Sequence, residues 1–287
     1  MISFALSLAM ALILPVESSP ASETVVAPAW AAVREARDAA GLPPLKRRPL
    51  LDRVAAARAR AVADLPHKRR LAYEVPVEAE LRRAGVTRFV RARVHMNMLR
   101  GYRHPGEAFA RQWKGQPSWN TALDADTQGI GLGVAGVADG WIVMVVVLVE
   151  DAPEFDGPEL ERRLIAAVNA VREEHGLEVL RPLPRLAAIA RSHSADMAAR
   201  DYLDHRSPEG QESADRLLAA GIHFRSMAEN IHMNRGQRDV IAAAVSGWME
   251  SPGHREAILT SEFTHTGAGV AEDADGKFYA TQIYLLP

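Results

Sequence analysis

Apolar positions recur with a helical period through much of the second half of the chain. Residues 160–175 carry apolar side chains three and four positions apart, which gives the segment one apolar face, and Gly176 follows as a helix stop. Pro184 can open a second helix that runs to about residue 200. Shorter helical patterns are expected over residues 213–220 and 238–250.

Two strand patterns follow these helices and end the chain. Residues 264–271 and 277–285 are rich in apolar residues, and the connection between them contains Asp275-Gly276, a strong hairpin signal. Earlier in the chain, residues 141–149 form a continuous apolar run that is short and rich in β-branched residues, so it is predicted to be a buried strand. We therefore expect helices on both sides of a small antiparallel sheet.

The pattern occurs twice, at an offset of about 135 residues between equivalent positions such as Trp113 and Trp248. Further pairs of segments keep nearly the same offset: 81–86 with 217–222, 94–97 with 231–234, and 131–134 with 267–270. Chance would not keep one offset across so many segments, so the chain is predicted to hold two copies of one domain. Glycines alternate within the last of these pairs but do not form a phosphate-binding motif, so they are predicted to allow close packing of the strand.

The beginning of the chain resembles an export signal. Residues 1–16 contain no charged side chain and, at about 1.5 Å per residue, are too short to cross a hydrocarbon layer of about 30 Å. Ser19-Pro20-Ala21 offers small residues for a cleavage site, although no basic side chain precedes the apolar run. The chain is therefore expected to be exported to the periplasm or the extracellular space, with this segment either removed or kept as an N-terminal anchor. No later stretch is long enough to span a membrane.

These patterns predict the following division of the chain: a signal peptide or membrane anchor at residues 1–22, a first domain at 23–150, an acidic linker at 151–158 and a second domain at 159–287.

Composition narrows the possible chemistry. The chain has 287 residues, a formal net charge of −2 and no cysteine, which excludes disulfides, thiolate metal sites and a cysteine nucleophile. A nucleic-acid partner is not expected, because binding one would require a basic stripe. Neither the H-E-x-x-H nor the G-x-S-x-G motif occurs.

Candidate functional residues gather in four motifs of the second domain. Pro252 ends one helix just before His254 and thereby fixes the direction of that imidazole. The motifs, in chain order, are Asp204-His205-Arg206-Ser207-Pro208, Ala228-Glu229-Asn230-Ile231, Ser251-Pro252-Gly253-His254 and Gly267-Ala268-Gly269-Val270. In this order and spacing they resemble the CAP superfamily of cysteine-rich secretory proteins, antigen 5 and pathogenesis-related 1 proteins, in its cysteine-free bacterial form. The resemblance covers roughly residues 158–287.

The resemblance implies an α+β fold, an α-β-α sandwich in two tandem copies, with a cleft that contains His205, Glu229 and His254. Two imidazoles and a carboxylate would make a three-ligand set for a divalent ion, most naturally zinc, with a fourth position left for water. Without a metal, the same residues would form an acid–base cluster or a hydrogen-bonded network that holds loops together. The family's fourth acid would fall at Ser251, one residue after Glu250. Either Glu250 is the fourth cleft residue, or water or the Ser251 Oγ atom completes the set, or the site is a triad.

The first domain lacks the same set of residues. Ala92 stands where Glu229 is expected and Trp119 where His254 is expected, while His67 is the candidate counterpart of His205. Residues that both domains keep, such as His95 and His232, are interpreted as scaffold, and His193 is predicted to be a core residue.

Two functions are compatible with this cleft. The first is an exported ligand- or metal-binding module that captures a lipid, a peptide or a wall fragment at the cell envelope or outside the cell. The alternative is a metal-dependent hydrolase that uses His205, Glu229 and His254 to activate water on an envelope or extracellular substrate. The sequence leaves open whether the protein is an enzyme.

Overall fold

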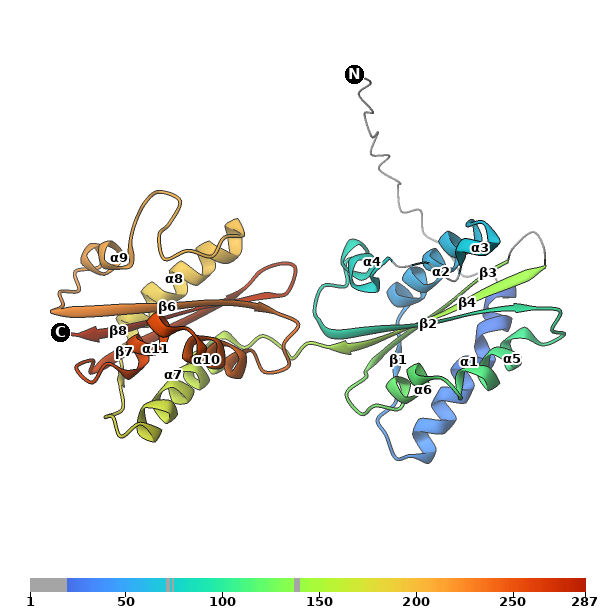
Figure 1. The fold of residues 1–287 in the computed structure, drawn as a ribbon, viewed down its shortest axis with the longest axis horizontal. Coiled ribbons are helices and arrows are strands. Elements are labelled where there is room, and N and C mark those ends of the chain that lie inside the picture. The colour runs from blue at the N-terminus through green and yellow to red at the C-terminus, as the bar shows by residue number, and fades with distance from the viewer. Residues whose placement is uncertain (1–19, 71–72, 74, 137–139) are drawn as a thin grey trace, which may run out of the picture. The chain divides into compact units, whose positions relative to one another are not determined.

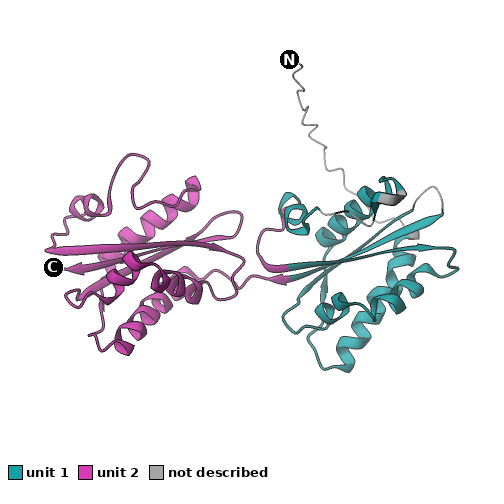
Figure 2. Cartoon of the chain, viewed as in Figure 1, with its two compact units in different colours: residues 1–84, 92–149 teal, residues 85–91, 150–287 magenta. Residues whose placement is uncertain are grey.

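A computed structural model describes residues 20–287 except residues 71, 72, 74 and 137–139 (Figure 1). Most of the predicted signal or anchor segment therefore lies outside the described residues, and so does the side chain of His67. The chain forms two compact units, one of residues up to 84 together with 92–149, the other of residues 85–91 and 150–287 (Figure 2). Among the described residues, no helix is long and apolar enough to cross a membrane.

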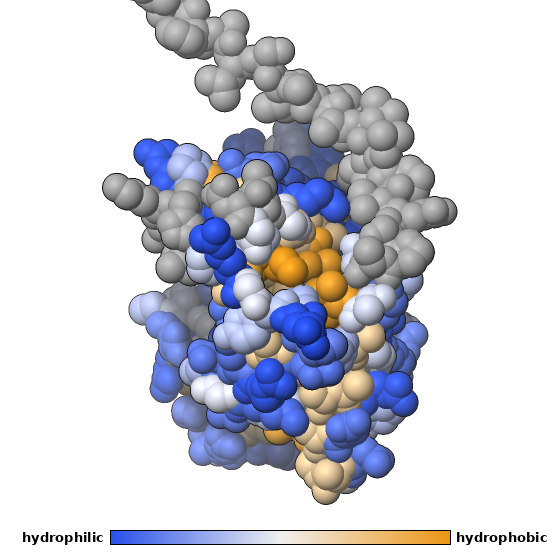
Figure 3. Space-filling view, turned by 90° about the vertical axis from the view of Figure 1, so that its right-hand side faces the viewer, coloured by the Kyte–Doolittle hydropathy of each residue, from blue (hydrophilic) through white to orange (hydrophobic). Residues whose placement is uncertain are grey.

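The first unit packs helices on both faces of a four-stranded sheet in the order β1-β3-β4-β2. Helices α2, α3 and α4 lie on one face, and α1, α5 and α6 on the other (Figure 1). The elements are α1 (Pro20–Ala39), β1 (Lys46–Arg47), α2 (Pro49–Ala63), α3 (His67–Arg70), α4 (Val77–Arg83), β2 (Phe89–Arg100), α5 (Pro105–Trp113), α6 (Pro117–Ala122), β3 (Gly129–Gly136) and β4 (Trp141–Asp151). An end-on view of this unit shows a hydrophobic area on an otherwise mostly hydrophilic surface (Figure 3).

The second unit repeats this plan with the sheet order β5-β7-β8-β6. Helices α8 and α9 cover one face, and α7, α10 and α11 cover the other (Figure 1). The elements are α7 (Gly157–Glu174), β5 (Arg181–Pro182), α8 (Pro184–Arg200), α9 (Ser213–Ala219), β6 (Ser226–Arg235), α10 (Val240–Glu250), α11 (Pro252–Leu259), β7 (His265–Glu272) and β8 (Lys277–Leu286). The predicted α+β class and the α-β-α sandwich in two copies are confirmed.

Two features of the sheets differ from the sequence-based expectation. The strands β1 and β5 pair in parallel with β3 and β7, so the sheets are not purely antiparallel. Each of these strands has two residues, too few to show a period of two in the sequence. Strand β6 was not predicted, because its residues alternate poorly between apolar and polar, yet it forms an edge of the sheet and carries the Ala228–Ile231 motif.

The glycines of β7 allow helix α8 to approach the sheet closely. A Cβ atom on Gly267 would lie 2.3 Å from the backbone N of Ala187, and one on Gly269 would lie 1.9 Å from the N of Arg191. In the first unit, Cβ atoms on Gly131 and Gly133 would meet the α2 backbone at 2.2 Å. The prediction that these glycines serve close packing is confirmed.

A buried arginine fastens the first helix of each unit to the loops around it. Arg172 donates from Nε to the Glu178 carbonyl at 2.9 Å, and from Nη1 to the carbonyls of Ile258 at 2.6 Å and Thr260 at 2.9 Å. Arg37 repeats this arrangement, with contacts to the carbonyls of Pro43 at 2.7 Å and of Ala122 and Asp124 at 2.8 Å. The two units therefore share this framework in atomic detail.

The side chain of Asn169 adds a second link in the second unit only. Its Nδ2 donates to the Leu180 carbonyl at 3.0 Å, and its Oδ1 accepts from the Leu180 N–H at 2.9 Å. At the equivalent position of the first unit, the chain has Arg34. One carboxamide thus satisfies both backbone groups of a buried residue.

We expect Asn169→Ala to lower the free energy of unfolding of the second unit by about 1–3 kcal/mol, because it leaves the backbone of buried Leu180 without partners. Urea denaturation followed by circular dichroism measures the change. The matched control is Arg34→Ala, which removes no such pair and should cost less than about 0.5 kcal/mol. Equal stabilities of the two variants would show that the Asn169 link contributes nothing.

Candidate functional site

Three side chains from separate segments meet beside the edge strand β6 of the second unit. Glu229 lies on β6, His205 lies in the loop between α8 and α9, and His254 lies in the first turn of α11. The His205 Nδ1 atom is 3.0 Å from Glu229 Oε1, and the two imidazole centroids are 6.1 Å apart. The structure therefore brings together the three residues that the motifs singled out.

The position of His254 depends on the bend at Pro252 and on one amide. Ser251 has extended backbone and Pro252 starts α11, so α10 and α11 are separate helices. The buried Asn230 side chain donates from Nδ2 to the backbone carbonyl of His254 at 3.0 Å. The Asn of the Ala-Glu-Asn motif thus holds the start of α11 against β6.

The loop that carries His205 is held by two side chains. His193 on α8 is 2% exposed, and its Nε2 atom lies 2.9 Å from the carbonyl of Asp204. Arg216 on α9 donates from Nη1 to the carbonyl of His205 at 3.0 Å. The prediction that His193 is a core residue is confirmed, and its ring also fixes the backbone beside His205.

Glu229 is the most enclosed member of the site, with a side chain that is 3% exposed. Besides His205, its oxygens accept from Ser213 Oγ at 2.8 Å and from Arg216 Nη2 at 2.9 and 3.1 Å. Burial raises the pKa of the Glu229 carboxyl, but the hydrogen bond from His205, the charge of Arg216 and the bond from Ser213 outweigh it, so the pKa lies below the usual range. The group is therefore a paired carboxylate at neutral pH.

The two histidines differ in their affinity for a proton. The hydrogen bond to Glu229 raises the pKa of His205 above its ordinary value, against the opposing effect of burial. Burial, together with the charge of His205, lowers the pKa of His254. One cleft thus contains an imidazole that favours its charged form and another that favours its neutral form, an arrangement suited to acid–base chemistry.

The geometry limits how a metal ion could be held. Both Glu229 oxygens already accept hydrogen bonds from protein donors, so the carboxylate orients His205 and is not a free third ligand. Within the part of the chain that the structure describes, no group of three or more histidine and acidic side chains is arranged to hold a metal ion. The residues present therefore do not fit the three-ligand set, and zinc binding stays a prediction that would rest on the two imidazoles.

Glu250, the candidate fourth residue, lies apart from this group. It is exposed at the end of α10 and accepts from Ser246 Oγ at 3.2 Å, one helical turn earlier. No contact between Glu250 and His205, Glu229 or His254 is found among the described residues.

The partners of Glu229 were not predicted from the sequence. Ser213 and Arg216 lie on the short helix α9, where the apolar pattern marks only Leu217 as buried. The sequence did contain one signal for these partners. A serine and an arginine one helical turn apart precede the Ala-Glu-Asn motif. Burial and, to a smaller extent, the neighbouring His254 lower the pKa of His232, the histidine that was interpreted as scaffold.

The first unit has no equivalent of this cleft among its described residues. Ala92 is buried where Glu229 would be. Trp119, at the position of His254, is 7% exposed and packs edge-on against Trp113 with ring centroids 4.9 Å apart. An indole and a methyl group thus fill the space that polar side chains use in the second unit.

Two curated relatives each match a stretch of this chain that is about as long as one domain. Two proteins of Bacillus subtilis, the uncharacterized membrane protein YlbC and the uncharacterized protein YkwD, are each 37% identical to it, over 125 and 112 residues. These matches cover 44% and 39% of this chain but only 34% and 42% of the relatives, so the chain spans less than half of their length.

Two solved structures with related descriptions are also similar to this chain. An extracellular protein with an SCP domain from Bacillus anthracis is 24% identical, with a TM-score of 0.42 over 54% of this chain and 60% of that one. A cysteine-rich secretory protein from Staphylococcus aureus is 19% identical, with a TM-score of 0.39 over 56% of this chain and 57% of that one.

The family assignment rests on the whole-domain matches. The model of the Cysteine-rich secretory protein family, CAP, matches residues 30–149 and again residues 165–284, which together make up most of the chain. The protein therefore belongs to the cysteine-rich secretory protein (CAP) family and contains two CAP domains in tandem.

Proposed function

We propose that the protein is an exported CAP-domain protein whose second domain captures a ligand in the His205–His254 cleft at the cell envelope or outside the cell. The observation that carries this proposal is the support of His205 by the buried Glu229. The His205 side chain is 44% exposed, whereas the Glu229 carboxylate behind it is almost completely enclosed. A buried, paired carboxylate thus presents one imidazole to solvent beside a second imidazole.

The charge of the cleft favours one class of ligand group. His205 has a raised pKa and so carries more positive charge near neutral pH than an ordinary histidine. A carboxylate or phosphate group on a lipid, a peptide or a wall fragment would accept a hydrogen bond from its free Nε2 atom. We therefore propose an acidic group as the part of the ligand that enters the cleft.

Two observations support export. The first 16 residues carry no charged side chain, and the Bacillus anthracis protein with a similar fold is described as extracellular. YlbC of Bacillus subtilis is described as a membrane protein.

The opposite pKa shifts favour hydrolysis as the second candidate function. His254, whose pKa is lowered, can accept a proton from water, while His205, whose pKa is raised by Glu229, can donate one to a leaving group. If a divalent ion binds, the imidazoles of His205 and His254 would hold it, and the ion would supply an activated water. Glu229 would then orient His205 through its Nδ1 atom.

We expect the His205 imidazole to titrate above about pH 6.5 and the His254 imidazole below it, as measured by NMR of the full chain. Glu229→Gln should lower the pKa of His205, because the anionic acceptor is lost. The stability that the His205–Glu229 pair contributes is full below the unfolded pKa of about 6.5 and is lost as pH rises through the raised folded pKa.

The control for this titration is Glu250→Gln. Its side chain is exposed and bonded to Ser246, so the pKa values of both histidines should not change. A His205 pKa that is the same in Glu229→Gln and in the wild type would show that the buried carboxylate does not tune the imidazole.

For zinc, we expect His205→Ala and His254→Ala to abolish binding, and Glu229→Gln to weaken it about 10–100-fold, as expected for a residue that orients a ligand. Glu250→Ala should have no effect. Isothermal titration calorimetry and elemental analysis of the purified chain measure both affinity and stoichiometry.

The affinity for zinc should fall as pH drops, because protonated imidazoles cannot bind the ion. The fall should begin above pH 6.5, because His205 has a raised pKa. Stoichiometric binding that survives in His254→Ala would contradict this site.

A further inference from the structure

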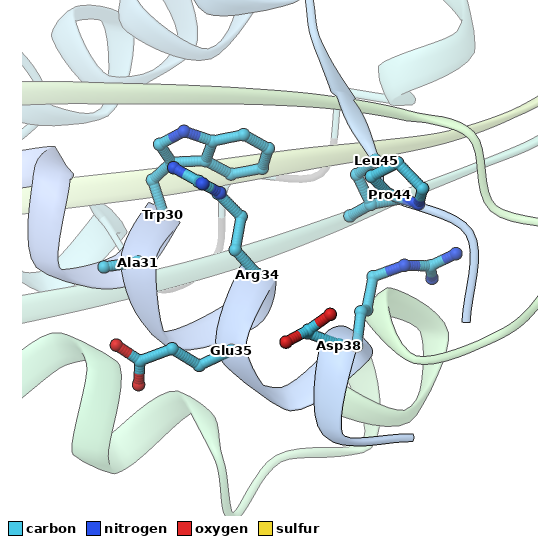
Figure 4. A pocket seen from close by; sticks show the side chains of 8 residues that line it. Trp30, Ala31, Arg34, Glu35, Asp38, Pro44 and Leu45 are labelled. Atoms are coloured by element: carbon cyan, nitrogen blue, oxygen red, sulfur yellow. The ribbon is translucent and has the colours of Figure 1, made fainter. Parts of the chain in front are cut away.

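A pocket of about 440 Å³ lies in the first unit between α1 and the loop that leads to β1. Trp30 and Arg34 of α1 line one side, Pro44 and Leu45 of the loop line the opposite side, and Asp38 lies below them (Figure 4). The volume is within the range of small-molecule sites, which is about 300–1,000 Å³. The pocket belongs to the domain that lacks the histidine cleft.

The second unit shows how the equivalent position is filled in the other copy of the domain. The main-chain path is the same, because the Leu42 N–H bonds to the carbonyl of Arg37 and the Leu177 N–H bonds to that of Arg172, both at 2.9 Å. The buried Arg37 and Arg172 also make equivalent contacts. Leu45 therefore occupies the position that Leu180 occupies in the second unit.

The two copies differ at the helix position that faces this leucine. In the second unit, the carboxamide of Asn169 bonds both the N–H and the C=O of Leu180. In the first unit, the guanidinium of Arg34 lies over the Trp30 ring, with its Cζ atom 5.7 Å from the ring centroid. Figure 4 shows Arg34 beside Trp30, across the pocket from Leu45.

The first copy is left with polar groups of two buried residues that have no partner within the described part of the chain. Leu45 is 5% exposed, and no hydrogen bond within the described residues satisfies its backbone N–H or C=O. Arg37 is another residue of the pocket lining, and its Nη2 atom is buried without a partner among the described residues, whereas Nη2 of Arg172 donates to the Phe263 carbonyl at 3.4 Å. Buried polar groups without partners are rare in proteins, and here they gather at one pocket.

These groups require a ligand that donates and accepts on the same side. A primary carboxamide does so, as the Asn169 side chain shows. A carboxylate cannot donate to the Leu45 carbonyl, and a trans secondary amide directs its N–H and C=O in opposite directions. The Trp30 indole offers an apolar face to the remainder of the ligand. Two acidic and two basic side chains line the pocket, so its charge does not select an anion.

We propose that this pocket binds a small ligand with a primary carboxamide, whose amide takes the place that Asn169 fills in the second copy. The amidated end of a peptide and the side chain of its asparagine or glutamine both present this group. The first CAP domain is then a second binding domain, separate in chemistry from the histidine cleft.

The test is an NMR titration of the full, ¹⁵N-labelled chain with N-acetylphenylalaninamide, which represents an amidated end. The Leu45 amide resonance should shift in a saturable manner, because its N–H gains an acceptor. N-acetylphenylalanine, which has a carboxylate in place of the carboxamide, should bind roughly tenfold more weakly, as expected for the loss of one hydrogen bond to a buried acceptor. A second probe, N-acetylglutamine methylamide, carries its primary carboxamide on the side chain. Binding of this probe would identify a side chain as the source of the carboxamide group.

A substitution provides the matched control. Arg34→Asn places a carboxamide at the Asn169 position, so it should satisfy Leu45 internally, raise the thermal stability of the chain and abolish the shift. Arg111→Asn, on the exposed face of α5, should leave binding unchanged. Ala31→Trp, at an exposed position of α1 that lines the pocket, is a second variant and should also weaken binding.

Two results would overturn the proposal. The first is the absence of a saturable Leu45 shift in the wild-type chain with either carboxamide probe. The second is equal affinity of the wild-type chain for the amide and the carboxylate. In the reciprocal variant, Asn169→Ala, the Leu180 amide should gain the response that Leu45 shows, which would support the proposal directly.

Discussion

The burial of the Glu229 carboxylate is the constraint on which the site depends. An unpaired charge at such a position would cost about 3–5 kcal/mol, so the chain must bring donors to it. Helix α9 supplies Arg216 and Ser213, and the same Arg216 also binds the carbonyl of His205. Pairing the buried Glu229 carboxylate therefore also fixes the position of α9, the path of the loop before it and the direction of the His205 imidazole. The first unit has Ala92 instead, so it needs no such partners.

The two domains share one framework. They differ in which polar groups have no hydrogen-bond partner or are exposed to solvent. Both fix their first helix through a buried arginine, Arg37 or Arg172, and both use glycines to bring a helix against the sheet. The second domain satisfies Leu180 with Asn169 and exposes histidines at the edge strand. The first fills that edge with aromatic rings and leaves Leu45 unsatisfied. The two domains thus present different polar groups on one fold.

Much of the fold could be predicted from the sequence, because long periodic helices, the final hairpin and the repeat are strong signals. The three residues of the cleft could also be named, because each lies in a short motif with its own local geometry. Strand β6 could not be predicted, since the residues that serve the site interrupt its alternation. Arg216 was missed because a charged residue on a short helix resembles an exposed one, and its burial depends on Glu229 from a distant segment. The end of α10 near Ser251 was predicted, but the exposed position of Glu250 was not, because the spacing does not fix which face of the helix this side chain occupies.

The close approach of α8 to β7 at Gly267 and Gly269 has a consequence for dynamics. The backbones of this helix and strand are in direct contact, so they exclude water and can separate only by opening the domain as a whole. His205 and His254 lie outside this pair, on a loop and on the short helix α11. Local opening of either segment exposes much less apolar surface than global unfolding does. Local opening of the His205 loop or of α11 therefore leaves the contact between α8 and β7 intact.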